Sequence, residues 1–107
     1  MARYLIMWRS NPVAPWPSDP VEYSEFIEKS FAAMDDLAEK GLTTEMGSFL
    51  DGNSGYAICE GEATDIYSAS SMFMPYWESE VYEMISWEKT KEITRALMKA
   101  QIEAAKK

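Results

Sequence analysis

Short apolar runs alternate with longer amphipathic stretches along this chain. Residues 2–9 (ARYLIMWR) are apolar on both alternating faces, which predicts a central β-strand covered on both sides. Weaker alternation over residues 43–50 and 56–60 predicts two further strands, joined as a hairpin by the turn sequence DGNSG at 51–55. Residues 77–86 are expected to form a fourth strand.

Helical spacing of apolar residues marks three helices between and after these strands. The first begins after Asp19, a good N-cap, with Pro20 at the first helical position and Glu22 three residues after the cap, and Gly41 is a natural end. A short second helix opens over residues 61–65 and ends before Pro75. An amphipathic third helix runs from about residue 87 to the end of the sequence.

This order of elements is β-α-β-β-α-β with an added C-terminal helix, in one domain over residues 1–107. Right-handed crossovers place both main helices on one face of a four-stranded antiparallel sheet, the ferredoxin-like arrangement of the α+β class. We expect the other face to carry an apolar set too large for one copy to leave in water. The expected members of that set are Tyr4, Ile6, Trp8, Tyr56 and Ile58. A homodimer with facing sheets, a dimeric α/β barrel, is therefore predicted.

Three blocks of sequence support the same architecture. They are Gly55-Tyr56-Ala57-Ile58-Cys59-Glu60, then Pro75-Tyr76-Trp77, then Glu80-Val81-Tyr82-Glu83. With their spacing, they resemble an uncharacterised family of about this length in the dimeric α/β-barrel group. That group includes muconolactone isomerase-like and cofactor-free monooxygenase-like members. The resemblance implies a dimer and a pocket and transfers no catalytic residue, and the proline-rich segment SNPVAPWPSDP departs from the family pattern.

Charge and composition exclude several classes of function. The net charge of −8 makes nucleic acid an unfavourable partner. The sequence has no histidine, the commonest general base and metal ligand, so we expect neither a metal nor a cofactor. A single cysteine, no signal-peptide pattern and no apolar run long enough to span a membrane favour a cytoplasmic protein.

Two local features could indicate a calcium site or a catalytic nucleophile. The stretch DGNSGYAICEGE places Asp51, Asn53 and Glu62 at positions 1, 3 and 12 of a calcium loop, but it has Tyr56 where that loop requires glycine, so a hairpin is favoured. Cys59 could be a nucleophile, but no histidine is available to activate it and the adjacent Glu60 and Glu62 would raise its pKa. We expect Cys59 to be a small core residue.

The sequence also predicts a ligand site, although no motif defines it. Its candidate residues are Arg3, Trp8, Glu45, Tyr56, Glu60 and Tyr82. Each of these residues can also have a structural role without a ligand. Arg3 can form a salt bridge to Glu45 or Glu60, acidic residues can mark an edge strand, and aromatic side chains can belong to the core or to a dimer interface. The segment around Trp16 is either a lid or an arm reaching to a partner.

The site leaves three functions open. We expect a small apolar or aromatic ligand between sheet and helices. One alternative is a cofactor-free isomerase or monooxygenase-like enzyme acting on a small aromatic or quinone-like substrate. The other is a barrel filled with side chains that serves as a non-enzymatic binding or assembly module.

Overall fold

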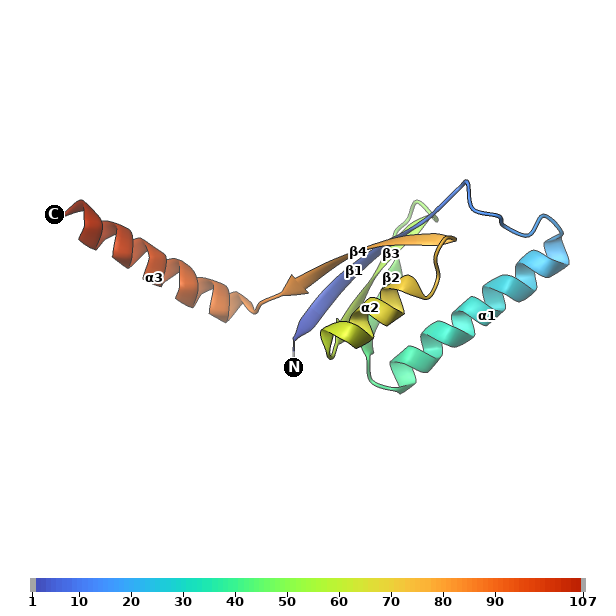
Figure 1. Ribbon diagram of the computed structural model, residues 1–107, viewed down its shortest axis with the longest axis horizontal. Helices are drawn as coiled ribbons and strands as arrows, with labels where there is room; N and C mark the ends of the chain where they lie inside the picture. Colours follow the sequence, from blue (N-terminus) through green and yellow to red (C-terminus); the bar gives the residue numbers. More distant parts are fainter. Residues whose placement is uncertain (1, 107) are drawn as a thin grey trace.

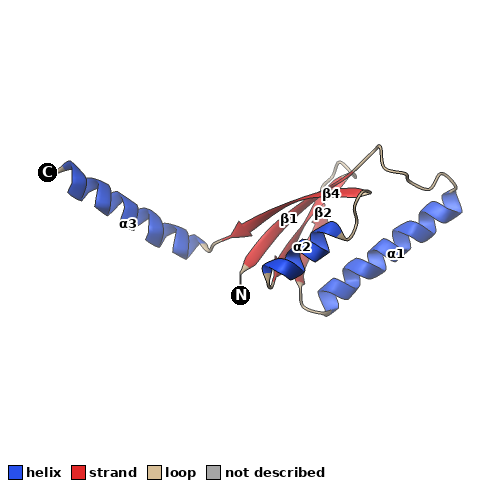
Figure 2. Ribbon diagram, in the orientation of Figure 1, coloured by secondary structure: helices blue, strands red, loops and turns tan. Residues whose placement is uncertain are grey.

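A four-stranded antiparallel sheet with strand order β2-β3-β1-β4 organises the chain (Figures 1 and 2). The computed structural model describes residues 2–106. Its elements are β1 Arg3–Ser10, α1 Pro20–Glu39, β2 Thr43–Ser48, β3 Ser54–Glu60, α2 Ala63–Ser71, β4 Trp77–Met84 and α3 Trp87–Ala105. Both α1 and α2 lie on one side of the sheet (Figure 1). The predicted ferredoxin-like βαββαβ order with an added C-terminal helix is thus confirmed, including the central position of β1 and the edge position of β4.

The helix ends follow the predicted signals. The Asp19 carboxylate accepts a hydrogen bond from the backbone N–H of Glu22 at 3.1 Å, which satisfies one of the free amides of the first turn of α1. Gly41, which follows α1 closely, has φ +82°, a conformation that favours glycine. The Ser86 hydroxyl caps α3 in the same way, accepting from the N–H of Lys89 at 3.0 Å.

Strand register decides which side chains lie under the helices. In the β1–β3 pair Trp8 is opposite Gly55, and Met7 is opposite Tyr56. Paired residues project to the same face and neighbours along a strand to opposite faces. Because Ile6 clusters with Ile66 of α2, the helix-covered face is the one that carries Tyr4, Ile6 and Trp8. Their predicted place on the uncovered face is wrong, whereas Tyr56 and Ile58 do lie there. We call the uncovered side the open face.

The core under the helices is small. It consists of Ile6, Ala57, Cys59 and Ile66, with Tyr4 and Leu42 packed against it. The helix α2 contributes Ile66 and Ala69, which are 2% and 7% exposed. By contrast, α1 buries no residue at all. Only one of the two helices is thus tightly packed on the sheet.

The proline-rich segment is an ordered strap between β1 and α1. The indole N–H of Trp16 donates to the carbonyl of Asn11 at 2.7 Å, and the side-chain amide of Asn11 donates to the carbonyl of Pro75 at 3.0 Å. The Trp16 ring packs edge-on against Tyr76 and Trp77, with centroid distances of 5.2 and 5.0 Å. The strap thus folds onto its own chain.

The helix α3 projects away from the rest of the chain, as Figure 1 shows. The chain measures 71 × 29 × 24 Å, with a radius of gyration of 19.2 Å. A compact domain of this length has a radius of gyration of about 13 Å. The predicted C-terminal helix is confirmed as an element, but it covers no part of its own sheet.

Candidate functional site

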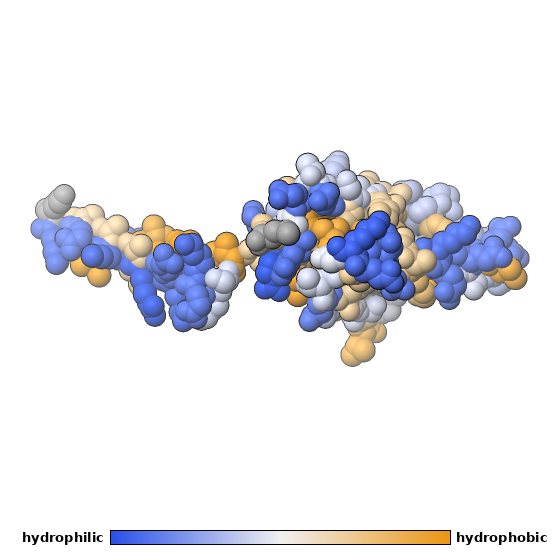
Figure 3. Space-filling view, turned by 90° about the horizontal axis from the view of Figure 1, so that it is seen from below, coloured by the Kyte–Doolittle hydropathy of each residue, from blue (hydrophilic) through white to orange (hydrophobic). Residues whose placement is uncertain are grey.

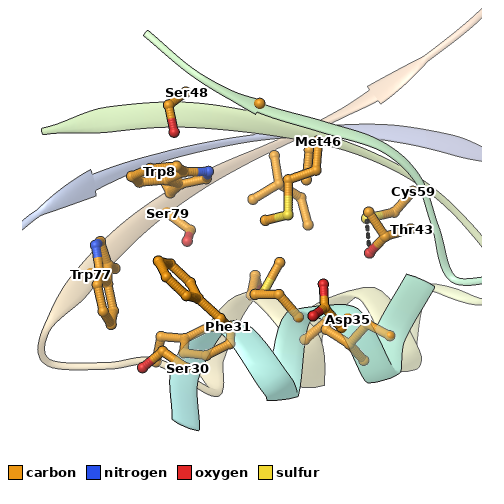
Figure 4. A pocket seen from close by; sticks show the side chains of 18 residues that line it. Trp8, Ser30, Phe31, Asp35, Thr43, Met46, Ser48, Cys59, Trp77 and Ser79 are labelled. Carbon is orange, nitrogen blue, oxygen red and sulfur yellow. Dashed lines mark hydrogen bonds between the residues drawn. The ribbon is translucent and has the colours of Figure 1, made fainter. Parts of the chain in front are cut away.

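The loose packing of α1 leaves a cleft of about 430 Å³ between this helix and the sheet. Its lining is predominantly apolar and comes from both layers. The larger side chains are Ile6, Trp8, Phe31, Met34, Met46, Phe73 and Trp77. Figure 4 shows Trp8 and Met46 projecting from the sheet toward Phe31 on α1. Phe31 is 57% exposed and Met46 is 41% exposed, so the cleft is open to solvent beside these two residues.

Trp8 forms one wall of the cleft and has an unsatisfied polar atom. Its indole nitrogen is buried and has no hydrogen-bond partner among the described residues. Leaving a buried donor unpaired costs about 1–3 kcal/mol. In Figure 4 the nitrogen lies on the side of the ring that faces Met46. The indole is thus a candidate donor to an acceptor entering the cleft.

Glycine at position 55 makes this placement of Trp8 possible. A methyl group at Gly55 would lie 2.2 Å from Cζ2 of Trp8 and 2.4 Å from the carbonyl oxygen of Gly47. The ring therefore lies directly over the β3 backbone. Small residues continue along the same face, with Ala57 and Cys59 both buried. Because these three residues of β3 have small side chains or none, they leave space between the sheet and α1, which contributes to the volume of the cleft.

The polar lining offers no activated nucleophile. Cys59 is 1% exposed, and its sulfur lies 3.8 Å from Oγ1 of Thr43. Burial raises the pKa of the Cys59 thiol, which keeps it protonated at neutral pH. The core role expected for Cys59 is confirmed, with burial as the principal cause of the shift and not the neighbouring glutamates. The other polar side chains of the lining are Ser30, Asp35, Ser48, Ser70 and Ser79, of which Figure 4 labels all but Ser70.

Five of the six candidate residues lie away from this cleft, on the open face. Register places Arg3, Glu45, Tyr56, Glu60 and Tyr82 there, and only Trp8 faces the cleft. Arg3 forms an ion pair with Glu60, Nε to Oε1 3.2 Å, one of the two pairings foreseen. Tyr56 donates to Glu45 at 2.9 Å, and Tyr82 donates to Glu80. These carboxylates raise the pKa of both phenols.

The remaining cleft residues were not among the candidates. Phe31 and Met34 belong to the helical apolar pattern of α1, which predicts burial and not an open wall. Met46 and Trp77 lie on the two edge strands. The available signal was the run of small residues at Gly55, Ala57 and Cys59 on one face of a strand.

The turn between β2 and β3 covers residues 49–53, and Ser54 and Gly55, predicted as part of the turn, are the first residues of β3. The Asp51 carboxylate accepts from the backbone N–H groups of Asn53 and Ser54 at 2.9 and 3.2 Å, and from the Ser54 hydroxyl at 2.8 Å. Gly52 has φ +77°. The prediction of a hairpin is confirmed, because β2 and β3 pair antiparallel. The Asp51 carboxylate accepts hydrogen bonds from Asn53 and Ser54, as in a turn.

Acid sensitivity of this turn is the first testable consequence. The hydrogen bonds from Asn53 and Ser54 lower the pKa of Asp51. The stabilisation is therefore present above the unfolded-state pKa and is lost as pH falls through the lower folded-state value. We expect Asp51→Ala to reduce the melting temperature at neutral pH, and this difference from the unsubstituted chain to shrink toward pH 3. Asp51→Asn, which keeps one acceptor, should lose less. A pH-independent difference measured by thermal melts would contradict this account.

Comparisons with protein-family models, curated proteins and solved structures found no match. The chain is therefore assigned to no family, and the resemblance noted above stays a prediction. Across residues 2–106, no helix is long and apolar enough to cross a membrane. The same residues include no cluster of three or more metal-ligating side chains. The cleft between α1 and the sheet is thus the feature from which a function can be argued.

Proposed function

We propose that the cleft between α1 and the sheet binds a small, flat, apolar molecule. The observation that carries this proposal is an open cleft of about 430 Å³ in a chain whose α1 buries no residue. Small-molecule sites typically occupy about 300–1,000 Å³ and are mainly apolar with a few polar groups. Aromatic rings of Trp8, Phe31, Phe73 and Trp77 line the cleft and suit a flat ligand.

The indole N–H of Trp8 would orient a ligand in the cleft by donating a hydrogen bond to it. A ligand carbonyl placed beside it would satisfy a donor that lacks a partner among the described residues. Less than 1 Å² of this nitrogen is accessible to solvent. The ligand carbonyl would therefore reach the N–H after a small rotation of the Trp8 ring toward the cleft. We therefore favour ligands that combine an aromatic body with one carbonyl-type acceptor. The residues lining the cleft support binding, and we propose no reaction for it.

We further propose that the chain is a homodimer in which the open faces of two sheets meet. The open face has an apolar centre of Leu5, Met7, Tyr56, Ile58, Tyr82 and Met84. Met7 is 38% exposed and Tyr82 is 49% exposed. Four strands of this length present roughly 400 Å² of face, at the upper limit for a monomer to leave in water. A second copy covers this surface with an identical one.

Paired ligands test the binding proposal. 9-Fluorenone and fluorene have the same flat ring system and differ in one carbonyl group. We expect 9-fluorenone to bind about tenfold more tightly than fluorene, because only its carbonyl satisfies the Trp8 N–H. Isothermal titration calorimetry on the full chain measures both affinities.

The control is Trp8→Phe, which keeps an aromatic ring and removes the donor. In this variant the two ligands should bind with equal affinity, while fluorene should bind much as it does to the unsubstituted chain. Absence of binding by either ligand would overturn the proposed function. A preference for 9-fluorenone that survives Trp8→Phe would overturn the role of the indole.

A further inference from the structure

The helix α3 presents an apolar side that nothing in residues 2–106 covers. Its exposed large residues are Trp87, Ile93, Leu97, Met98 and Ile102. At 100° per residue these positions fall on one half of the helix, and Glu92 lies on the opposite side. Figure 3 shows hydrophobic and hydrophilic surface side by side on the projecting helix. An amphipathic helix standing in water usually packs on another surface.

Charge indicates what kind of surface that is. Residues 87–107, which are α3 and the two lysines that follow it in the sequence, carry six basic and three acidic side chains, a net charge of +3. The 86 residues before them carry four basic and fifteen acidic side chains, a net charge of −11. Another copy's body therefore attracts α3. An anionic membrane would attract α3 and repel the body. A second copy's body repels this body as well, but in a symmetric pair two arms are attracted instead of one, so we favour a second copy as the partner.

The most acidic element of the body, α1, also buries none of its residues. The helix α1 carries six acidic side chains and one basic one within Pro20–Glu39. Beside it, Phe31 and Met46 flank the open side of the cleft and remain 57% and 41% exposed. This open side therefore offers apolar contacts next to negative charge, the complement of α3.

The connection from β4 directs α3 away from its own α1. Only Ile85 and Ser86 separate the two elements, and Ser86 is engaged as the N-cap of α3. In the sheet β4 is one edge, whereas β2, which carries Met46, is the other. A two-fold dimer that brought β4 of one copy beside β2 of the other would cover both edges and would start α3 next to the partner's β2, the strand that carries Met46.

We propose that α3 is an exchanged arm that docks on a second copy along α1 and closes the open side of that copy's cleft beside Phe31 and Met46. This inference rests on the homodimer of the proposed function. Each ligand cleft is then completed by the partner's α3, so binding and dimerisation are linked.

The interface area favours this arrangement. Two open faces of roughly 400 Å² each bury about 800 Å² in total, below the roughly 1,200 Å² of a specific interface. Helix α3 has 19 residues, so it is about 28 Å long, and a contact strip about 10 Å wide covers about 280 Å² on each surface. Two exchanged arms add about 1,100 Å², which brings the total to about 1,900 Å². The arms raise the contact to the size of a stable dimer.

Cross-linking between two single-cysteine chains tests the arm. Both chains carry Cys59→Ala; one also carries Phe31→Cys, and the other carries Leu97→Cys and a tag that changes its mass. The full-length chains are mixed, allowed to exchange subunits and treated with a short bis-maleimide. Light scattering on the same sample gives the number of chains. We expect a mass of two chains and a mixed 31–97 adduct as the main product.

The matched control replaces Leu97→Cys by Glu92→Cys, on the charged side of α3, and should lose the mixed adduct. A mass of two chains without the 31–97 adduct, or with a 97–97 adduct only, overturns the arm and leaves the proposed dimer standing. A mass of one chain overturns both. Co-sedimentation of the chain with phosphatidylserine vesicles that removes the 31–97 adduct also overturns the arm, because α3 then prefers a membrane.

Discussion

Replacing Trp16 with alanine is expected to reduce the free energy of unfolding by about 3 kcal/mol, the low end for removing a packed tryptophan. Trp16 packs on Phe26, Tyr76 and Trp77, with ring-centroid distances of 5.9, 5.2 and 5.0 Å. Its N–H also holds the strap to the carbonyl of Asn11. Urea unfolding followed by circular dichroism measures the loss.

Two variants make this result interpretable. Tyr67→Ala removes an aromatic side chain that is 74% exposed, and it should change stability by no more than about 0.5 kcal/mol. Trp16→Phe retains a ring and loses the hydrogen bond, so it should cost about 1 kcal/mol plus some packing. If Trp16→Ala costs no more than Tyr67→Ala, the strap is not anchored by this ring. Because Trp77 also lines the cleft, the strap supports one wall of the proposed site.

Gly55→Ala is expected to destabilise the chain by about 3 kcal/mol and to abolish binding of 9-fluorenone. The added methyl group would lie 2.2 Å from the Trp8 ring and 2.4 Å from the Gly47 carbonyl oxygen. The ring could move into the cleft, but the oxygen belongs to the backbone of the neighbouring strand. The substitution therefore disturbs both the sheet and the ligand donor. Urea unfolding and calorimetry measure the two effects.

Gly47→Ala is the matched control for this substitution. Its methyl group would lie 2.9 Å from Cε1 of Tyr56, and a side chain can move aside more readily than backbone. We expect a cost below about 1 kcal/mol and unchanged ligand binding. Equal stabilities of the Gly55→Ala and Gly47→Ala variants would show that Trp8 does not lie tightly over β3.

The order of elements could be predicted because each boundary has a local chemical cause. Asp19, Pro20 and Gly41 delimit α1, and the predicted turn at Asp51 joins β2 to β3, although β3 begins two residues earlier than predicted. The assignment of sheet faces could not be predicted in the same way, because β1 is apolar on both faces. The pairing of Trp8 with Gly55 places Trp8 on the same face as the small residues of β3, and the core cluster of Ile6 with Ile66 of α2 shows that the helices cover this face.

The cleft was harder to predict, because it exists where α1 does not pack tightly against the sheet. Trp8 was a candidate, but the sequence pattern of α1 predicts a buried helix, whereas Phe31 remains 57% exposed. The five polar candidates share the open face. Their pairings are Arg3 with Glu60 across β1 and β3, Tyr56 with Glu45 in the β2–β3 hairpin, and Tyr82 with Glu80 along β4, and only the pairing of Arg3 was predicted. Their pairing does not require a ligand.

The indole resonance of Trp8 tests the central claim most directly. The chain contains four tryptophans, so a ¹H–¹⁵N spectrum should show four indole signals, and the one absent in Trp8→Phe belongs to Trp8. We predict that titration with 9-fluorenone shifts the Trp8 signal most, followed by that of Trp77, which lines the same cleft from the adjacent strand. A Trp8 signal that stays in place at saturating ligand would contradict a binding site between α1 and the sheet.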